Sequence, residues 1–262
     1  MAPTTATGAE DSSVPLPPAR DFCSVLAAAE PLAGTAPHRP VWALVEHAGP
    51  WGRDAVLDAP WPVAGLGRVL TDRTESAGVR LVLSRPPGRR EAQPPVDASA
   101  PRRVLLARCG PGGWLAERAV PTAELATLDW AGLAACATVP DGWAASGPVW
   151  AVCTHGTRDA CCARLGRPLA QAFASVLPGT VREISHSGGH RFAGVALALP
   201  SGQLFGRVGP GDAAVLAEAV AAGRTVEDLL RGEVHRSPVE QVASAALRRR
   251  LGEERIGSLD RV

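Results

Sequence analysis

The chain has 262 residues, enough for two domains of ordinary size, and 46% of them are hydrophobic, so it can bury a core. A formal net charge of +1 gives no electrostatic case for nucleic acid or acidic lipid as a partner. Tyrosine is absent, which excludes tyrosine-based chemistry, and no apolar run approaches the roughly 20 residues of a membrane span.

Residues 1–20 are predicted to form a disordered tail, because they are rich in small polar residues and proline. They lack the basic and apolar regions of a secretory signal, so the protein is expected to be cytoplasmic. Thiols stay reduced there, so the six cysteines favour ligands or buried hydrophobes over disulfides. Cys23, Cys109 and Cys136 have no paired spacing and are predicted to be small buried hydrophobes.

Residues 41–57, VWALVEHAGPWGRDAVL, resemble residues 149–162, VWAVCTHGTRDACC. Each segment starts with Val-Trp-Ala in an apolar run and reaches a histidine, His47 or His155, followed by Arg-Asp-Ala. The likeness continues in three further pairs of segments, 78–90 with 179–192, 103–115 with 194–206, and 121–136 with 212–222. The chain therefore contains a degenerate repeat.

Each half is predicted to run strand, helix, strand, strand, strand, helix. A βαβ unit followed by a ββα unit is the thioredoxin-like order, so the expected fold class is α/β (α+β) with two tandem thioredoxin-like domains. The second of these is expected to carry a metal cluster. The expected parts are a degenerate domain without ligands at 21–140, a second domain at 145–232, and a C-terminal helical extension at 233–262.

The second half can be divided in more detail. Residues 149–152 are predicted to be a buried strand, and 160–177 a helix with Asp159 as N-cap and with a kink or a late start at Pro168. The remaining expected elements are strands at 180–185, 192–199 and 203–208, a helix at 212–222, and an amphipathic helix within 234–257.

Four residues of the second half have no counterpart of their own type in the first. In the alignment Val45 faces Cys153, Leu57 faces Cys162, Ser84 faces His186, and Gly88 faces His190. Unrelated residues would not be expected to disappear as a set, so these four are predicted to act together. By contrast His155 recurs as His47 and Arg158 recurs as Arg53, which favours structural roles for them.

The predicted topology brings the four residues to one end of the sheet. Cys153 ends the first strand, Cys162 lies in the first turn of the helix, and both histidines lie in the loop before the hairpin. Gly188 and Gly189 let that loop turn sharply. Two thiolates and two imidazoles suit a [2Fe–2S] cluster of the Rieske type, and they also suit a Cys₂His₂ zinc site.

The runs VCTHGTRDACCARLGRPL and SHSGGHRFAG resemble the sucrase/ferredoxin-like family, in its Apd-like branch, over roughly residues 149–210. The resemblance implies a thioredoxin-like [2Fe–2S] ferredoxin in which Cys153 and Cys162 bind one iron and His186 and His190 bind the other. Cys161 is adjacent to Cys162 and can take its place, so this assignment depends on the family's spacing alone.

The function expected from these residues is that of an electron carrier rather than an enzyme, with a reductase or an electron acceptor as its protein partner. Imidazole ligands also take up protons, so the midpoint potential is predicted to fall as pH rises. The first half is expected to serve as a structural partner domain. The sequence makes no prediction of the oligomeric state.

Three alternatives come from other classes of protein. A structural zinc protein would use the same four residues. A thiol oxidoreductase would use Cys153 with Cys161 or Cys162, but it would leave the two histidines without a role. A sugar hydrolase is suggested only by the family's name, and nothing in the sequence points to the pair of carboxylates that it needs.

Overall fold

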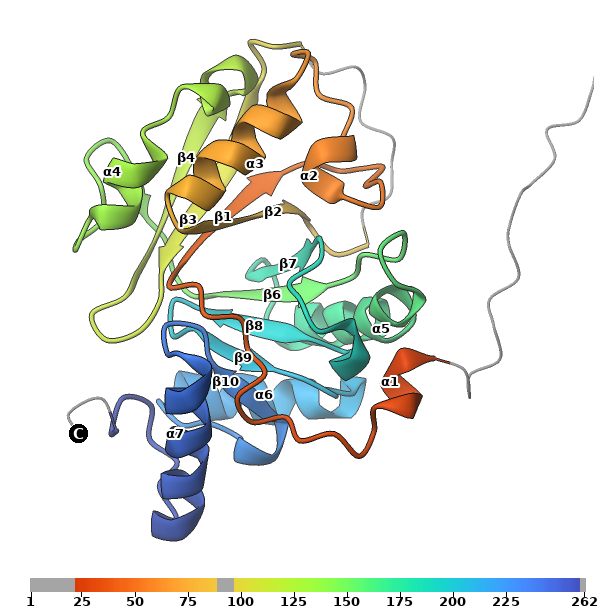
Figure 1. The fold of residues 1–262 in the computed structure, drawn as a ribbon, viewed down its shortest axis with the longest axis vertical. Helices are drawn as coiled ribbons and strands as arrows, with labels where there is room; N and C mark the ends of the chain where they lie inside the picture. The colour runs from red at the N-terminus through yellow and green to blue at the C-terminus, as the bar shows by residue number, and fades with distance from the viewer. Residues whose placement is uncertain (1–21, 89–96, 260–262) are drawn as a thin grey trace, which may run out of the picture.

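The computed structural model describes residues 22–88 and 97–259, and the predicted tail at 1–20 lies outside them. Within these described residues, ten strands form one mixed sheet in the order β10-β9-β8-β6-β7-β2-β1-β3-β4-β5 (Figure 1). The strands are β1 (Val41–Glu46), β2 (Val79–Arg85), β3 (Pro101–Arg108), β4 (Trp114–Pro121), β5 (Ala144–Ala145), β6 (Val149–Cys153), β7 (Val181–Ile184), β8 (Ala196–Leu199), β9 (Gln203–Phe205) and β10 (Leu230–Glu233). The fold is therefore of the mixed α/β class, as predicted.

The α-helices of the described residues are α1 (Cys23–Leu26), α2 (Ala55–Asp58), α3 (Leu66–Ser76), α4 (Trp130–Ala135), α5 (Ala160–Val176), α6 (Ala213–Ala221) and α7 (Pro238–Leu251). Short 3-10 helices are η2 (Thr122–Ala126), η3 (His190–Phe192), η4 (Pro210–Asp212) and η5 (Glu227–Leu229). Among these residues no helix has the length and apolar character to cross a membrane.

The two halves of the sheet have the same strand order. In the first half β1 pairs parallel with β2 and antiparallel with β3, and β3 pairs antiparallel with β4. In the second half β6 pairs in the same way with β7 and β8, and β8 with β9. The halves join where β2 and β7 pair antiparallel, with Ser84 opposite Ile184 and Arg85 opposite Glu183. They thus share one sheet, and the division into two tandem domains stays a prediction.

The register corrects the alignment of the first strands by one residue. Val41 is opposite Val79 in the first half, whereas Trp150, not Val149, is opposite Val181 in the second. The residue equivalent to Cys153 is therefore Leu44 rather than Val45. By the same shift His155 stands at the position of Glu46 and not of His47.

A hydrophobic cluster shared by both halves explains this shift. Trp42 and Leu44 of β1 pack in one cluster with Ala151 and Cys153 of β6. Since successive residues of a strand point to opposite faces, Cys153 points into this shared core. Separate clusters fill the space between each half of the sheet and its own helices.

Most predicted elements of the second half form within a few residues of their expected bounds. The helix expected at 160–177 is α5, which begins directly after Asp159 and runs through Pro168 without a late start. The strand expected at 192–199 begins only at Ala196, because His190–Phe192 forms a turn of 3-10 helix. In the first half the helical stretch expected at 121–136 is divided into η2 and α4.

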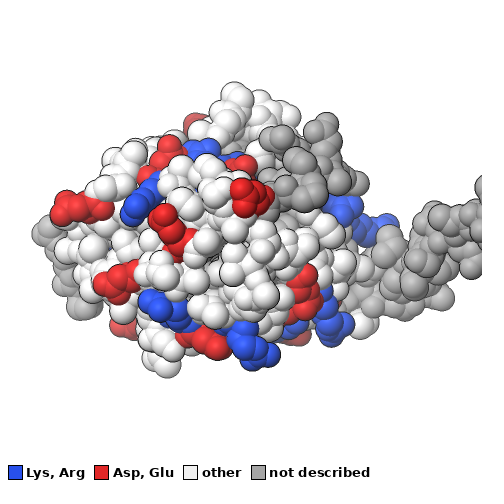
Figure 2. All heavy atoms as spheres, turned by 90° about the horizontal axis from the view of Figure 1, so that it is seen from above, with Lys and Arg blue, Asp and Glu red and all other residues white. Residues whose placement is uncertain are grey.

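Charged side chains are mixed on the surface. On the face shown in Figure 2, acidic and basic groups of the described residues are interspersed, so this face presents no continuous basic surface.

Candidate metal centre

Cys153 and Cys162 are brought together by the connection between β6 and α5. Cys153 is the last residue of β6 and is 2% exposed, and Cys162 lies in the first turn of α5. That turn is fixed by the predicted N-cap, since the Asp159 carboxylate accepts a 2.8 Å hydrogen bond from the Cys161 backbone N–H. A Cβ at Gly166 would overlap the carbonyl oxygen of Cys153, so a glycine lets α5 pack directly against the end of β6.

His186 and His190 lie in the loop between β7 and β8, as predicted. Gly188 and Gly189 have φ angles of +100° and +74°, in the left-handed region that favours glycine. The Arg231 guanidinium donates a 3.0 Å hydrogen bond to the Gly188 carbonyl, and a Cβ at Gly189 would overlap its Nη2 atom. A buried arginine therefore holds the loop that presents both imidazoles.

Three of the four predicted ligands form one compact group. The ligand atoms of Cys153, Cys162 and His186 all lie within 4.8 Å of one another, with 3.9 Å between Cys162 Sγ and His186 Nδ1. The hydrogen bond between the two thiols lowers the pKa of Cys153 well below its usual value and raises the pKa of Cys162. The group therefore stabilises one thiolate, the form in which cysteine binds a metal.

Cys161 points away from this group and belongs to a second one. Its Sγ lies 3.2 Å from Cys23 Sγ, and both thiols lie within 4.8 Å of the Asp159 carboxylate. The prediction that Cys23 is a buried hydrophobe holds only in part: it packs against Phe22 and Cys161, but it is half-buried, its thiol also meets polar groups, and burial raises its pKa to about 12. Cys109 is buried as predicted, and Cys136 is only partly buried.

His190 stands between the two groups. Its ring centroid lies 5.8 Å from that of His186, while its Nδ1 lies 2.9 Å from the Asp159 carboxylate and 3.0 Å from Cys23 Sγ. An imidazole that donates from Nδ1 to a carboxylate presents Nε2 as its metal-binding atom. Asp159 thus caps α5 and fixes the orientation of His190 at the same time.

The N-terminal segment is tied over the histidine loop. Arg207 donates hydrogen bonds of 2.7 Å and 2.6 Å to the carbonyls of Ala27 and Glu30, and Arg191 forms an ion pair with the Glu30 carboxylate at 2.7 Å. Phe22 packs in a small cluster with Cys161 and Ala193. These contacts place Cys23 at the site, although no spacing in the sequence pairs it with Cys161.

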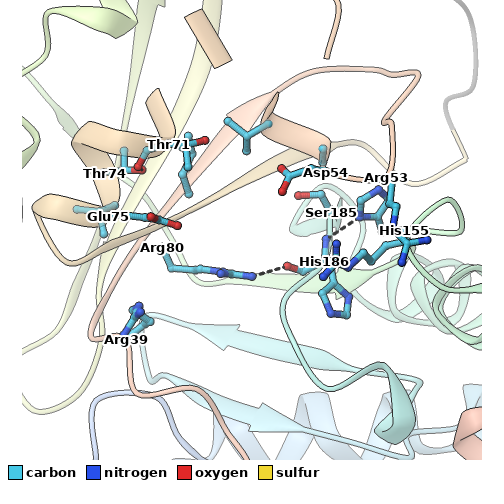
Figure 3. A pocket seen from close by; sticks show the side chains of 15 residues that line it. Arg39, Arg53, Asp54, Thr71, Thr74, Glu75, Arg80, His155, Ser185 and His186 are labelled. Carbon is cyan, nitrogen blue, oxygen red and sulfur yellow. Dashed lines mark hydrogen bonds between the residues drawn. The ribbon is translucent and has the colours of Figure 1, made fainter. Parts of the chain in front are cut away.

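His155 connects the site to the first half of the chain. Its Nδ1 accepts a 3.1 Å hydrogen bond from the His186 backbone N–H (Figure 3), and its Nε2 lies 2.7 Å from the Gly52 carbonyl. Burial lowers the pKa of His155, so the neutral ring can accept at one nitrogen and donate at the other.

Comparisons with known proteins find a matching family model and a related protein. The model of the sucrase/ferredoxin-like family matches residues 67–232. Altered inheritance of mitochondria protein 32 from Debaryomyces hansenii is 34% identical over 94 residues, which cover 32% of this chain and 34% of that protein. The chain therefore matches about a third of the length of this relative.

Two solved structures of the thioredoxin-like [2Fe–2S] ferredoxin from Aquifex aeolicus also match. For its Cys59Ser variant the TM-score is 0.30 at 20% identity, over 32% of this chain and 97% of that one. For a second structure of this ferredoxin the TM-score is 0.29 at 21% identity, over 32% of this chain and 88% of that one.

Proposed function

Because the chain belongs to the sucrase/ferredoxin-like family, we propose that it is an electron-transfer protein that binds a [2Fe–2S] cluster through Cys153, Cys162, His186 and His190. The observation that carries the proposal is the convergence of Cys153, Cys162 and His186, whose ligand atoms lie within 4.8 Å of one another. Two thiols facing an imidazole are the donors that such a cluster accepts.

The fourth ligand of the proposal is His190, acting through Nε2. Its Nδ1 faces the Asp159 carboxylate at 2.9 Å, and this contact supports Nε2 as the free donor. The two cysteines come from one segment and the two histidines from another, so one iron would have thiolate ligands and the other imidazole ligands.

When bound, a [2Fe–2S] cluster supplies one-electron redox chemistry. The chain contributes an asymmetric environment, since Cys153 is 2% exposed in the shared core whereas the His190 side chain is 44% exposed. The histidine side is therefore the side on which we propose that a reductase or an electron acceptor docks. The exposed histidine side can exchange protons with solvent, so we propose that electron uptake is coupled to proton uptake at the imidazole ligands.

A structural zinc site is the second candidate. The compactness of the Cys153, Cys162 and His186 group supports it, because one tetrahedral ion also needs ligand atoms at short mutual distances. A thiol oxidoreductase has less support, because Cys153 and Cys162 are both buried and reactive cysteines are partly exposed.

The test is an ultraviolet–visible spectrum of protein purified without air, with iron, zinc and acid-labile sulfide measured on the same sample. A red-brown protein with about two irons and two sulfides per chain is expected. A colourless protein with one zinc would replace the electron carrier by the structural site. A protein with neither metal and with two titratable thiols at Cys153 and Cys162 would favour thiol chemistry.

A further inference from the structure

A polar cavity of about 200 Å³ lies beside His186, between the histidine loop and the first half of the chain (Figure 3). Its wall includes His155 and His186 from the second half and residues of α3 and β2 from the first. The charged residues that line it are Arg39, Arg53, Asp54, Glu75, Arg80 and Arg158.

Positive charge is in excess in this cavity. Four arginines face two carboxylates, and none of the four forms an ion pair with a residue in 22–88 or 97–259. In particular Arg158 does not pair with Asp159, whose carboxylate faces His190. Unpaired guanidinium groups around a hollow are typical of a site for an anion.

Arg80 is the central residue of this site. It extends from β2 and donates a 2.9 Å hydrogen bond from Nη2 to the His186 carbonyl, as Figure 3 shows. Its Nε is buried and has no hydrogen-bond partner among the described residues. Burial, and next to it the nearby Arg39, lower the pKa of Arg80, although the charges of Glu75 and Asp54 partly offset this effect.

Comparison of the two halves shows that Arg80 lacks a carboxylate partner that its equivalent has. Its equivalent in the second half is Arg182, which reaches across the β2–β7 junction to the Glu46 carboxylate at 2.8 Å. By the strand register the residue equivalent to Glu46 is His155, which lies at the same cavity as Arg80. A neutral imidazole thus replaces the carboxylate, and the charge of Arg80 is left for a ligand.

We propose that this cavity binds a phosphate group, free or as a phosphate ester, with Arg80 as its central contact. The excess of two positive charges matches a dianion, and one guanidinium group can donate two parallel hydrogen bonds to phosphate oxygens. One further part of the proposal rests on the proposed function. Because Arg80 also donates a hydrogen bond to the His186 carbonyl, phosphate binding at Arg80 regulates His186 as a metal ligand.

The test is a calorimetric titration of the full-length protein with inorganic phosphate, at an ionic strength held constant with potassium chloride. We expect two substitutions, Arg53→Gln and Arg80→Gln, each to weaken phosphate binding at least about tenfold, because each removes charge-assisted hydrogen bonds. Arg53 is exposed, so its substitution should not disturb folding. Arg68→Gln is the matched control, since Arg68 lies on α3 outside the cavity and should leave binding unchanged. Melting temperatures of all variants show that they are folded.

Equal binding by the wild type, Arg53→Gln and Arg80→Gln would overturn the proposal, and so would the absence of phosphate binding to the wild type. Ribose 5-phosphate in place of phosphate distinguishes the sources: tighter binding assigns an ester, and weaker binding assigns the free anion. The titration does not depend on the cluster. If the protein as purified contains no iron but binds phosphate, the cavity proposal stands and the proposed function fails. If it contains iron but binds no phosphate, the proposed function stands and the cavity proposal fails.

Discussion

The thiol of Cys23 lies 3.2 Å from the thiol of Cys161, although 138 positions separate the two residues in the sequence. The contact joins the N-terminal segment to the first turn of α5, one residue before the proposed ligand Cys162. Two thiols at this distance can be linked when the backbone allows a small movement.

We expect hydrogen peroxide to form a disulfide between Cys23 and Cys161. The two thiols lose two protons and two electrons, and the peroxide is reduced to two molecules of water. Peptide mass spectrometry without a reductant should find the two peptides linked, and the link should be absent from Cys23→Ser. Cys109 should stay unmodified, because it is buried in the hydrophobic core shared by both halves. A Cys23 peptide that stays reduced while other cysteines oxidise would contradict this prediction.

Adjacent cysteines on α5 provide a matched test of the ligand set. Cys162→Ser removes a thiol that lies with Cys153 and His186, whereas Cys161→Ser removes one that faces Cys23. We expect the iron content per chain to fall at least about tenfold in Cys162→Ser and to remain near the wild-type value in Cys161→Ser. Iron and sulfide assays on protein purified without air measure both, and the reverse ranking would exchange the two assignments.

Asp159 is expected to orient His190 as a metal ligand, in addition to capping α5. Asp159→Asn keeps an N-cap of equal preference but removes the charge that faces His190 Nδ1. We expect metal affinity to fall about 10- to 100-fold, as for other carboxylates that orient a ligating histidine. Asp129→Asn is the control, because Asp129 caps α4 in the half without ligands and lies outside the cavity beside His186. Competition with a chelator measures the affinities, and equal values for both variants would show that Asp159 only caps the helix.

Gly166 is expected to tolerate no side chain. Gly166→Ala places a Cβ against the Cys153 carbonyl, so α5 must move from the end of β6. We expect a loss of about 1–3 kcal/mol in the free energy of unfolding, although alanine is the better helix former. Gly211→Ala is the control, since its Cβ would meet nothing within 4 Å. Urea unfolding measures both, and a Gly166→Ala protein as stable as the wild type would show that the close contact is unimportant.

His47 predicts how stability depends on pH. Burial, with a contribution from Arg102, lowers the pKa of His47 from 6.5 to about 4. The unfolded chain therefore binds more protons than the folded one between these values, and stability falls as the pH is lowered from 6.5 toward 4. The full loss relative to neutral pH, reached below pH 4, is on the order of 3 kcal/mol.

The variant His47→Asn retains an acceptor for the Gly49 N–H, which bonds to His47 Nδ1 at 3.1 Å, but it cannot be protonated. We expect urea unfolding of this variant at several pH values to show a shallower loss of stability than the wild type below pH 6.5. Parallel curves for the two proteins would mean that His47 does not contribute to the acid sensitivity.

Local features of the second half could be predicted from the sequence because they depend on neighbouring residues. The Asp159 cap, the turn at Gly188 and Gly189, and the order of strands around α5 follow from side-chain chemistry and periodicity within short segments. The convergence of Cys153, Cys162 and His186 then follows from the topology, since the connections concerned lie at one end of the sheet.

The tertiary structure alone decided which thiols and charges meet across long distances in the sequence. Cys23 pairs with Cys161 because Arg207 and Arg191 hold the N-terminal segment over the histidine loop, and no local pattern encodes that contact. The one-residue shift between the first strands depends on which faces pack in the shared core. That shift puts His155 where Glu46 stands in the other half, and so leaves the charge of Arg80 without a carboxylate.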